Sequence, residues 1–298
     1  MLIRQIRVPP SPLRTDADNR ICIPTIPPLD SPGVDLAARR TPRADVRTLA
    51  VIPARLGATR LPRKPLRLLG GIPLVVRVWE RVQALGIVSD AVVATDSDEV
   101  AQAVLHAGGR VEMTAATHPS GTDRVAEVVA RTAYQHFDAI VNVQGDEPFV
   151  AAEAIEGALR QVVELGYPLG TAAVPLDPAR IADPNVVKVV TADDGRAMYF
   201  SRAAIPYLRD PADVAVQQSL VRQHIGVYAY TRDALACWVA LPPHPLELTE
   251  RLEQLRPLAA GLAMGVASIA GPLAGGIDTE EDLRRADAAW PRHPTDET

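Results

Sequence analysis

Short apolar runs alternate with amphipathic segments between residues 46 and 166, and this alternation constrains the fold more than any other feature. The apolar, β-branched runs predict buried strands at 46–54, 91–95 and 138–143. Apolar residues at helical spacing predict helices at 73–86, 97–109, 123–134 and 151–166. Parallel strands need a crossover connection, which is usually a helix. The order therefore predicts an α/β fold with a mostly parallel, doubly wound sheet.

The second half of the chain is less regular. Strand-like runs separated by proline-rich loops occur at 170–176, 186–190, 197–200 and 222–230. They predict that residues 170–230 form, in part, a smaller antiparallel extension of the sheet and a candidate subunit interface. A helix at 246–261, a strand at 263–270 and a helix from Thr279 are expected to return the chain to the core.

The composition is that of an ordinary globular protein, with 47% hydrophobic and 22% charged residues. Residues 1–45 contain eight prolines and no sustained periodicity, which predicts a disordered or extended leader before a single domain at 46–290 and a tail at 291–298. A net charge of −5 argues against nucleic acid as a partner. The sequence has no apolar run of the roughly 20 residues that span a bilayer, no secretion signal and no cysteine framework. We therefore expect a cytoplasmic protein with no membrane partner.

Three cations follow the first predicted strand, at the sheet edge where open α/β proteins bind ligands. Arg55, Arg60 and Lys64 lie within ten residues of one another. They are either a site that surrounds a polyphosphate or a solvated basic loop. The segment contains neither the Walker A pattern nor the GxGxxG fingerprint, which argues against a P-loop protein and an NAD-dependent enzyme.

Lysine is nearly absent from this chain. Of the 31 basic residues, only Lys64 and Lys188 are lysines. Lysine is a compact point charge, whereas arginine is a planar fork, so the two are not equivalent at a structured site. Either chance or a need for a compact ammonium group explains these two positions.

Carboxylates follow the third predicted strand, in the segment QGDEP at 144–148. Asp146 is a natural Mg²⁺ ligand, because this ion favours oxygen ligands and usually shares them with substrate phosphates. Glu147 is a second candidate, unless one of the two carboxylates caps the following helix. Asp278, which follows a glycine pair, is either a further ligand or a cap beside Thr279.

The remaining polar features are less specific. Ser120, Gly121 and Thr122 form a polar turn that opens a predicted helix, and this turn is either a nucleoside-binding turn or an ordinary helix start. His118 and His224 have no partner at a metal-ligand spacing, which argues against a histidine-bound metal. No supported Ser-His-Asp or Cys-His arrangement is present, so covalent catalysis is not expected.

Several segments occur together in a fixed order: PAR-x4-R-x3-K after the first strand, VATDS after the second, HPSGTDR, VQGDEP after the third, YFSR, QHIGVYAY, LEQLR and GIDTEEDL. Their order and spacing, from about Val46 to Ala289, resemble the CMP-KDO synthetase family, the 3-deoxy-manno-octulosonate (KDO) cytidylyltransferases. The resemblance implies a Rossmann-like nucleotidyltransferase fold and a homodimer. It also implies Mg²⁺-dependent transfer of CMP from CTP to an acidic sugar, with release of pyrophosphate.

The resemblance further implies roles for individual residues. Asp146 and Asp278 would hold Mg²⁺, and Arg55, Lys64 and Asp146 would be catalytic. The residues expected to bind the nucleotide are Arg55, Arg60, Arg63, Lys64, Asp96, Ser120 and Gly121. The residues expected to line the acceptor pocket are Gln144, Arg202, His224, Tyr228, Glu253 and Gln254. Among them, Arg202 would hold the acceptor's anionic group through a bidentate contact.

Two departures from the family pattern leave the acceptor open. The family's Pro-Gly-Lys-Pro is PRKP at 62–65 here, and Arg63 is expected to exclude a positive φ and to add a cation near the phosphates. A Gly-Tyr-Gly-type element is VYAY at 227–230. The arginine bias would also suit GC-rich bacteria without lipopolysaccharide. The acceptor is therefore either KDO or a small phosphonate such as phosphonoformate, and a CTP-sensing module without catalysis and uridylyl transfer are further alternatives.

Overall fold

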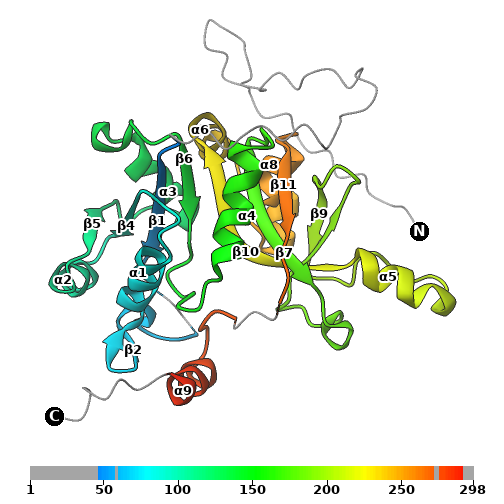
Figure 1. Ribbon diagram of the computed structural model, residues 1–298, viewed down its shortest axis with the longest axis horizontal. Helices are drawn as coiled ribbons and strands as arrows, with labels where there is room; N and C mark the ends of the chain where they lie inside the picture. The colour runs from blue at the N-terminus through cyan, green and yellow to red at the C-terminus, as the bar shows by residue number, and fades with distance from the viewer. Residues whose placement is uncertain (1–45, 58–59, 272–274, 291–298) are drawn as a thin grey trace, which may run out of the picture. The chain divides into compact units, whose positions relative to one another are not determined.

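The computed structural model describes residues 46–57, 60–271 and 275–290, so the predicted leader (1–45) and tail (291–298) lie outside the described residues. Within the described residues, nine strands form one sheet with the order β11-β7-β10-β6-β1-β4-β5 along its main path (Figure 1). The seven strands on this path are β1 (Thr48–Ala54), β4 (Asp90–Thr95), β5 (Arg110–Met113), β6 (Ala139–Asn142), β7 (Leu169–Pro175), β10 (Arg222–Thr231) and β11 (Met264–Ser268).

Most neighbouring strands on this path are parallel. β1 pairs in parallel with β4 and β6, β4 with β5, and β7 with β11. The predicted α/β fold with a mostly parallel sheet is confirmed. β10 runs antiparallel between β6 and β7, so one antiparallel strand lies inside the sheet and not in an extension. β8 (Lys188–Thr191) and β9 (Ala197–Ser201) form the smaller antiparallel extension that the sequence predicted.

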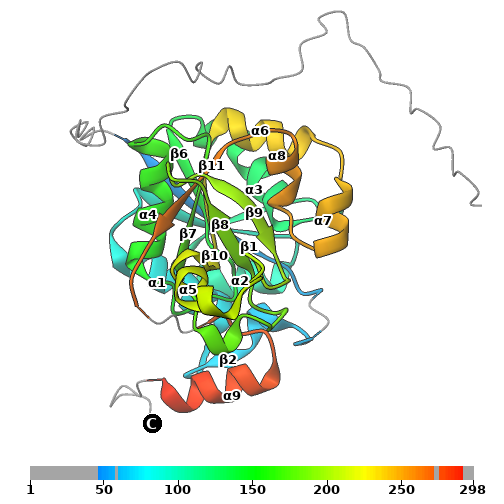
Figure 2. The same cartoon turned by 90° about the vertical axis from the view of Figure 1, so that its right-hand side faces the viewer.

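Helices cover both faces of the sheet (Figures 1 and 2). Alternate side chains of β1 enter two separate hydrophobic clusters, with Ala50 and Ile52 in one and Leu49 and Val51 in the other. All four are fully buried, as expected for a parallel strand covered on both faces. The first cluster includes α1 (Leu74–Leu85), α2 (Asp98–His106) and α4 (Ala152–Val163). The second includes α3 (Gly121–Ala130), α6 (Arg232–Ala240) and α8 (Leu255–Ala259).

Several helix ends follow the predicted local signals. Helix α1 ends at Gly86, whose φ of 64° lies in the left-handed region that glycine tolerates. The Ser97 side chain caps α2 by accepting the N–H of Val100. Thr279 caps α9 (Glu280–Ala289) in a capping box with Asp282, so Asp278 precedes the cap and its carboxylate is left for other contacts.

The prediction of one helix at 246–261 is wrong. The chain forms α7 (Pro245–Glu250) and α8, separated by a turn in which Arg251 has a φ of 54°. A buried ion pair between Glu247 and Arg256, with a nitrogen–oxygen distance of 2.5 Å, joins the two helices across this turn. The break matters because it places Glu253 and Gln254 in the lining of a cavity.

Among the described residues, five helices and strands were not predicted. They are the short edge strand β5, the hairpin of β2 (Leu68–Leu69) with β3 (Ile72–Pro73), helix α5 (Val214–Leu220) and helix α6. Helix α5 projects from the sheet, at the right of Figure 1. Within the described ranges, no helix combines the length and the apolar character needed to cross a lipid bilayer.

Candidate active site

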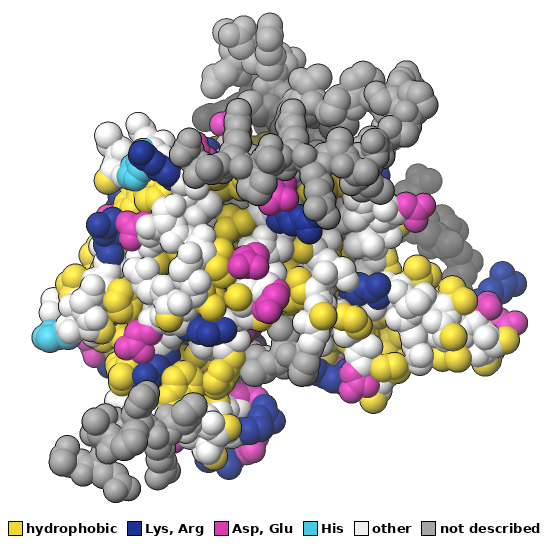
Figure 3. Space-filling view, in the orientation of Figure 1, with side chains coloured by type: hydrophobic (Ala, Val, Ile, Leu, Met, Phe, Trp, Pro, Cys, Tyr) yellow, Lys and Arg dark blue, Asp and Glu magenta, His cyan; other side chains and the backbone are white. Residues whose placement is uncertain are grey.

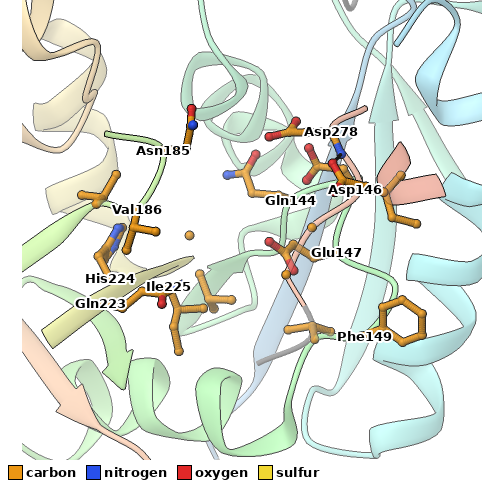
Figure 4. Close-up of a pocket in the computed structure, with 18 of the residues that line it drawn as sticks. Gln144, Asp146, Glu147, Phe149, Asn185, Val186, Gln223, His224, Ile225 and Asp278 are labelled. Atoms are coloured by element: carbon orange, nitrogen blue, oxygen red, sulfur yellow. Dashed lines mark hydrogen bonds between the residues drawn. The ribbon is translucent and has the colours of Figure 1, made fainter. Parts of the chain in front are cut away.

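A cavity of about 1200 Å³ lies beside the segment that follows β6. Figure 4 shows Asp146 and Asp278 close together on one side of it, with Gln144 beside them. Asn185, Val186 and His224 lie across from them on what we call the opposite wall. The cavity therefore brings residues from the first loop, the loop after β6, the extension and the start of α9 into one place.

Lys64 joins the two aspartates. Its Nζ donates to Asp146 Oδ2 at 2.5 Å and to Asp278 Oδ1 at 2.7 Å. The guanidinium of Arg60 contacts the other oxygen of Asp278 at 3.1 Å. Only 12% of the Lys64 side chain is exposed, so this contact is shielded from water. The structure thus brings together Arg60, Lys64, Asp146 and Asp278, which the sequence predicted to act together.

Backbone contacts explain how residues so far apart in sequence meet. The N–H of Ile277 donates to the carbonyl of Asp146 at 2.9 Å. The N–H of Gly276 donates to the Glu147 carboxyl, and a Cβ at position 276 would lie 2.8 Å from Glu147 Oε1. A side chain at position 276 would therefore displace the Glu147 carboxyl from this contact. The Glu147 carboxyl and the Asp146 carbonyl thus hold residues 276–277 in place. Asp278 follows these residues directly and so lies next to Asp146.

Charge crowding alters the protonation of this side of the cavity. Burial, with the nearby charges of Asp146 and Asp278, raises the pKa of Glu147 to about 8, so its carboxyl is mostly protonated at neutral pH. Burial lowers the pKa of Lys64 and the two aspartates raise it, and the net result is a pKa above the ordinary value. Lys64 is therefore a stable cation between two carboxylates.

The residues present fit the expected magnesium ion. Asp146 and Asp278 already converge on a single cation, the Lys64 ammonium group, and their oxygens are the donors that Mg²⁺ prefers. Among the described residues, no group of three His, Cys, Asp or Glu side chains is placed to hold a metal. Mg²⁺ is usually held by one or two carboxylates with substrate phosphates and water, which is the arrangement this site allows.

Gly145 sets the position of Asp146. A Cβ at Gly145 would lie 2.7 Å from the carbonyl oxygen of Pro53 in β1, which cannot move away cheaply because it is backbone. We expect Gly145→Ala to displace the loop and lower kcat about 100-fold, since displacements near 1 Å have effects of that order. Gly275→Ala is the matched control, because no described atom lies within 4 Å of a Cβ there. Steady-state kinetics of both variants test this, and equal rates for the two would contradict it.

Burial keeps two titratable side chains of the opposite wall, His224 and Tyr228, uncharged. The Nε2 atom of His224 lies 2.9 Å from Thr171 Oγ1, and its ring packs edge-on against Phe200. Burial lowers the pKa of His224 to about 3, so the ring is neutral at physiological pH. Burial also raises the pKa of Tyr228 well above its ordinary value, which keeps its hydroxyl protonated. Both side chains line the cavity as neutral hydrogen-bonding groups.

Two cations hold the backbone of this wall. Lys188 is fully buried, and its Nζ donates to the carbonyls of Asp183 (2.9 Å), Val186 (2.7 Å) and Arg202 (2.5 Å). The guanidinium of Arg202 donates in turn to the carbonyls of Glu250 (2.7 Å), Pro184 (2.9 Å) and Arg251 (3.4 Å). The arrangement supports the need for a compact ammonium group at position 188, because three carbonyls surround a single nitrogen.

We expect Lys188→Met to lower the free energy of unfolding by about 3 kcal/mol, because three buried carbonyls lose a charged donor. Lys188→Arg is expected to destabilise by about 1–3 kcal/mol, because a planar guanidinium overpacks a fully buried site. Urea unfolding midpoints measure both changes, with the half-exposed Arg196→Met as control. A Lys188→Arg protein as stable as the wild type would show that the compact ammonium is not needed.

The turn between α7 and α8 supplies the third side of the cavity. Glu253 accepts a hydrogen bond from Thr122 Oγ1 at 3.0 Å, and burial raises the pKa of Glu253. Gln254 is only 2% exposed and also lines the cavity. Ser120 caps α3, and the adjacent Gly121 faces the cavity. The predicted nucleoside loop and the predicted acceptor residues therefore meet at Glu253.

Five of the seven predicted nucleotide residues are not part of the cavity lining, and two of these five, Lys64 and Ser120, contact residues that are. Arg55 is exposed after β1. Asp96 forms an ion pair with the buried Arg124 at 3.3 Å. Arg63 pairs with Glu99 of α2, and its side chain is directed there. Nucleotide binding by all seven predicted residues remains a prediction.

The expectation that Arg63 excludes a positive φ is wrong. Its φ is 56°, in the left-handed region, which costs a non-glycine residue about 1–2 kcal/mol. The buried Pro65 and the hydrogen bond from Leu66 N to Arg63 O (2.9 Å) hold the turn in this form. The substitution therefore keeps the backbone that glycine would adopt, and its charge is used in the Glu99 pair.

The cavity also contains residues that sequence reasoning missed. Arg285, from α9, could have been found as a cation one helical turn beyond the capping box. Thr122, by contrast, belongs to the predicted nucleoside turn and also lines the cavity. Asn185 was not identified from the sequence, and Gln223, the first residue of QHIGVYAY, was given no role there, because their position depends on how the extension packs.

Comparison with known proteins identifies the family. A family model described as cytidylyltransferase matches residues 49–265. The chain belongs to the cytidylyltransferase family. A relative named 3-deoxy-manno-octulosonate cytidylyltransferase, from Gemmatimonas aurantiaca, is 63% identical over 242 residues, which cover 81% of this chain and 93% of the relative. A relative of the same name from Methylococcus capsulatus is 46% identical over 243 residues, covering 79% and 94%.

A solved structure of a cytidylyltransferase agrees with this assignment. CMP:2-keto-3-deoxy-manno-octonic acid synthetase complexed with CTP is 38% identical to this chain, with a TM-score of 0.74. The match covers 81% of this chain and 97% of that structure. The predicted nucleotidyltransferase fold and the predicted CTP-dependent enzyme class are confirmed.

Proposed function

We propose that this cytidylyltransferase transfers CMP from CTP to 3-deoxy-manno-octulosonate and releases pyrophosphate. The observation that carries the proposal is the contrast between two facing sides of the cavity. One side holds Asp146, Asp278 and the cations Arg60 and Lys64, which suits a metal-bound triphosphate. The 63% identical relative bears the name of this activity.

The opposite wall supports a polyhydroxylated acceptor. It presents neutral hydrogen-bonding groups at Asn185, Gln223, His224 and Tyr228, which match hydroxyl groups. Arg202 supplies a cation for a carboxylate. Three of its five N–H donors are used by carbonyls, so among the described residues two are left for a ligand. A small phosphonate would leave much of a cavity of about 1200 Å³ unfilled.

The reaction is an in-line displacement. An acceptor hydroxyl oxygen forms a bond to the α-phosphorus, the bond to pyrophosphate breaks, and the hydroxyl proton passes to solvent. When bound by Asp146 and Asp278, Mg²⁺ would neutralise phosphate charge and lower the pKa of the acceptor hydroxyl. Arg60 and Lys64 neutralise the triphosphate, and Gln144, Glu253 and Gln254 orient the two reactants. We name no protein base.

A homodimer in the cytoplasm, where CTP is available, belongs to this proposal. Apolar side chains are exposed on the region predicted as a subunit interface, among them Met198 (63%), Val216 (58%) and Leu220 (54%). Hydrophobic side chains gather over α5, at the right of Figure 3. Such a cluster favours contact with another protein surface. Light scattering should give the mass of two chains, and the mass of one chain would contradict this part.

The proposal is tested by pyrophosphate release with CTP and Mg²⁺ in the presence of KDO, phosphonoformate or no acceptor. Release with KDO alone is expected. Release with phosphonoformate and none with KDO would overturn the proposed acceptor. CTP binding without release from either acceptor would indicate a sensor. Replacing CTP by UTP in the same assay tests the choice of base.

A further inference from the structure

Lys64 lies where the metal ion is expected. Its ammonium nitrogen is 2.5 Å from Asp146 Oδ2 and 2.7 Å from Asp278 Oδ1. These are the two carboxylates assigned to Mg²⁺ under the proposed function, on which this inference rests. The contacts are short, charge-assisted hydrogen bonds in a shielded place, which are stronger than ordinary ones.

An ammonium group and a metal ion cannot share these oxygens in this geometry. Mg²⁺ requires ligand oxygens at about 2.0–2.1 Å, and a cation bridging the same two oxygens would be placed against the Lys64 nitrogen. In the absence of nucleotide, Mg²⁺ is hydrated, and it loses its bound water reluctantly. Metal binding through these two oxygens therefore requires that Lys64 first leave them.

We propose that Lys64 is a resident counter-ion, which occupies the aspartate pair in the free protein and leaves it when a triphosphate accepts its ammonium group. The free protein would then bind divalent metal weakly, and the nucleotide would create the metal site. This coupling would make the site complete only when the substrate is present.

The local structure supports a movement of the side chain alone. The backbone at Lys64 is fixed, because Pro65 is buried and Arg67 N donates to Lys64 O at 3.1 Å. The lysine stem has four flexible methylene groups, whereas an arginine would be held by its planar fork. The compact ammonium at position 64, like that at 188, is thus a requirement of its site.

Arg60 provides a matched comparison. It carries the same charge and contacts the same residue, Asp278, at 3.1 Å, but it touches only the oxygen that Lys64 does not use. Removal of Arg60 therefore lowers the positive charge near the metal site without vacating the position between the two aspartates. The pair of variants separates occupancy of the site from general electrostatic repulsion.

The first test measures Mn²⁺ binding without nucleotide by electron paramagnetic resonance. We expect Lys64→Met to bind Mn²⁺ at least ten times more tightly than the wild type, and Arg60→Met less than three times more tightly. Equal gains for the two variants would overturn the inference, as would no gain for Lys64→Met.

The second test uses the intact wild-type protein, and so does not depend on the folding of a variant. Because the chain has only two lysines, protein labelled with ¹³C,¹⁵N-lysine gives side-chain NMR signals from Lys64 and Lys188 alone. We expect millimolar Mg²⁺ alone to leave both signals unchanged, and Mg²⁺ with CTP to shift that of Lys64 only. A Lys64 signal that moves with Mg²⁺ alone, or does not move with Mg²⁺ and CTP, would overturn the inference.

Neither test contains an acceptor. A protein that turned over no KDO would fail the proposed function and could still show the expected behaviour of Lys64. Failure of the proposed function and failure of the inference about Lys64 can therefore be distinguished.

Discussion

The Asp146→Asn variant is expected to lose about three orders of magnitude in kcat and to keep its fold. A metal-binding carboxylate contributes several kcal/mol of charge stabilisation in the transition state, and each 1.4 kcal/mol corresponds to about tenfold in rate. Asparagine retains the shape of the side chain, and Lys64 keeps its contact with Asp278 at 2.7 Å. Circular dichroism and thermal unfolding should therefore resemble those of the wild type.

Asp278→Asn is expected to behave like Asp146→Asn, because the two carboxylates contact the same cation. Glu280→Gln is the control. It removes an exposed carboxylate two residues away that pairs with Arg67, and its rate should stay within about twofold of the wild type. Near-full activity of either aspartate variant with saturating Mg²⁺ would remove that residue from the metal site.

The second large effect is expected on the acceptor. Arg202→Ala should raise the KM for KDO about 100-fold or more and leave the KM for CTP within a few-fold. Arg202 is partly buried, and loss of one partner from a hydrogen-bonded charge pair that is shielded from water typically has an effect of this size. Two causes act together: the acceptor carboxylate loses a cation, and the carbonyls of Pro184, Glu250 and Arg251 lose their donor.

Arg180→Ala is the matched control for Arg202→Ala. Arg180 also lines the cavity, but it is about half exposed and pairs only with Asp183, at 3.7 Å. We expect its effect on the KM for KDO to be under threefold. Steady-state kinetics with one substrate varied at a time separate the two constants. A defect of Arg202→Ala confined to CTP would contradict the assignment of Arg202 to the acceptor.

Much of the fold was predictable because each core strand can be recognised from the residues of its own short segment. β1, β4 and β6 are short, mostly apolar segments that contain β-branched residues, and Gly86 and Ser97 mark helix ends by their own chemistry. The break between α7 and α8 was not predictable. It depends on the buried pair of Glu247 with Arg256, whose two members are ordinary helix formers when considered alone.

The position of β10 between β6 and β7 could not be predicted from the sequence either. Periodicity identifies a strand, but its neighbours in the sheet depend on long-range pairing. Helix α5 was missed because it has no buried residue, and therefore no apolar face toward the core.

In the candidate site, the predictable residues were those at strand ends. Asp146 lies four residues after the buried strand β6, and ligand sites lie at that edge of the sheet. The role of Lys188 was visible only as a rare residue type, since its three carbonyl partners come from the packing of separate segments. Arg63 shows the converse: its charge suggested a phosphate contact, but its position at the start of a turn directs it to Glu99.

The central claim is that this cavity joins CMP to KDO. Phosphorus-31 NMR of the protein with CTP, Mg²⁺ and KDO tests it directly, because each product has its own signal. We expect one CMP phosphodiester and one pyrophosphate for every CTP consumed, no consumption without KDO, and neither product with Asp146→Asn. Loss of CTP without a phosphodiester, or a phosphodiester formed with phosphonoformate but not with KDO, would contradict the claim.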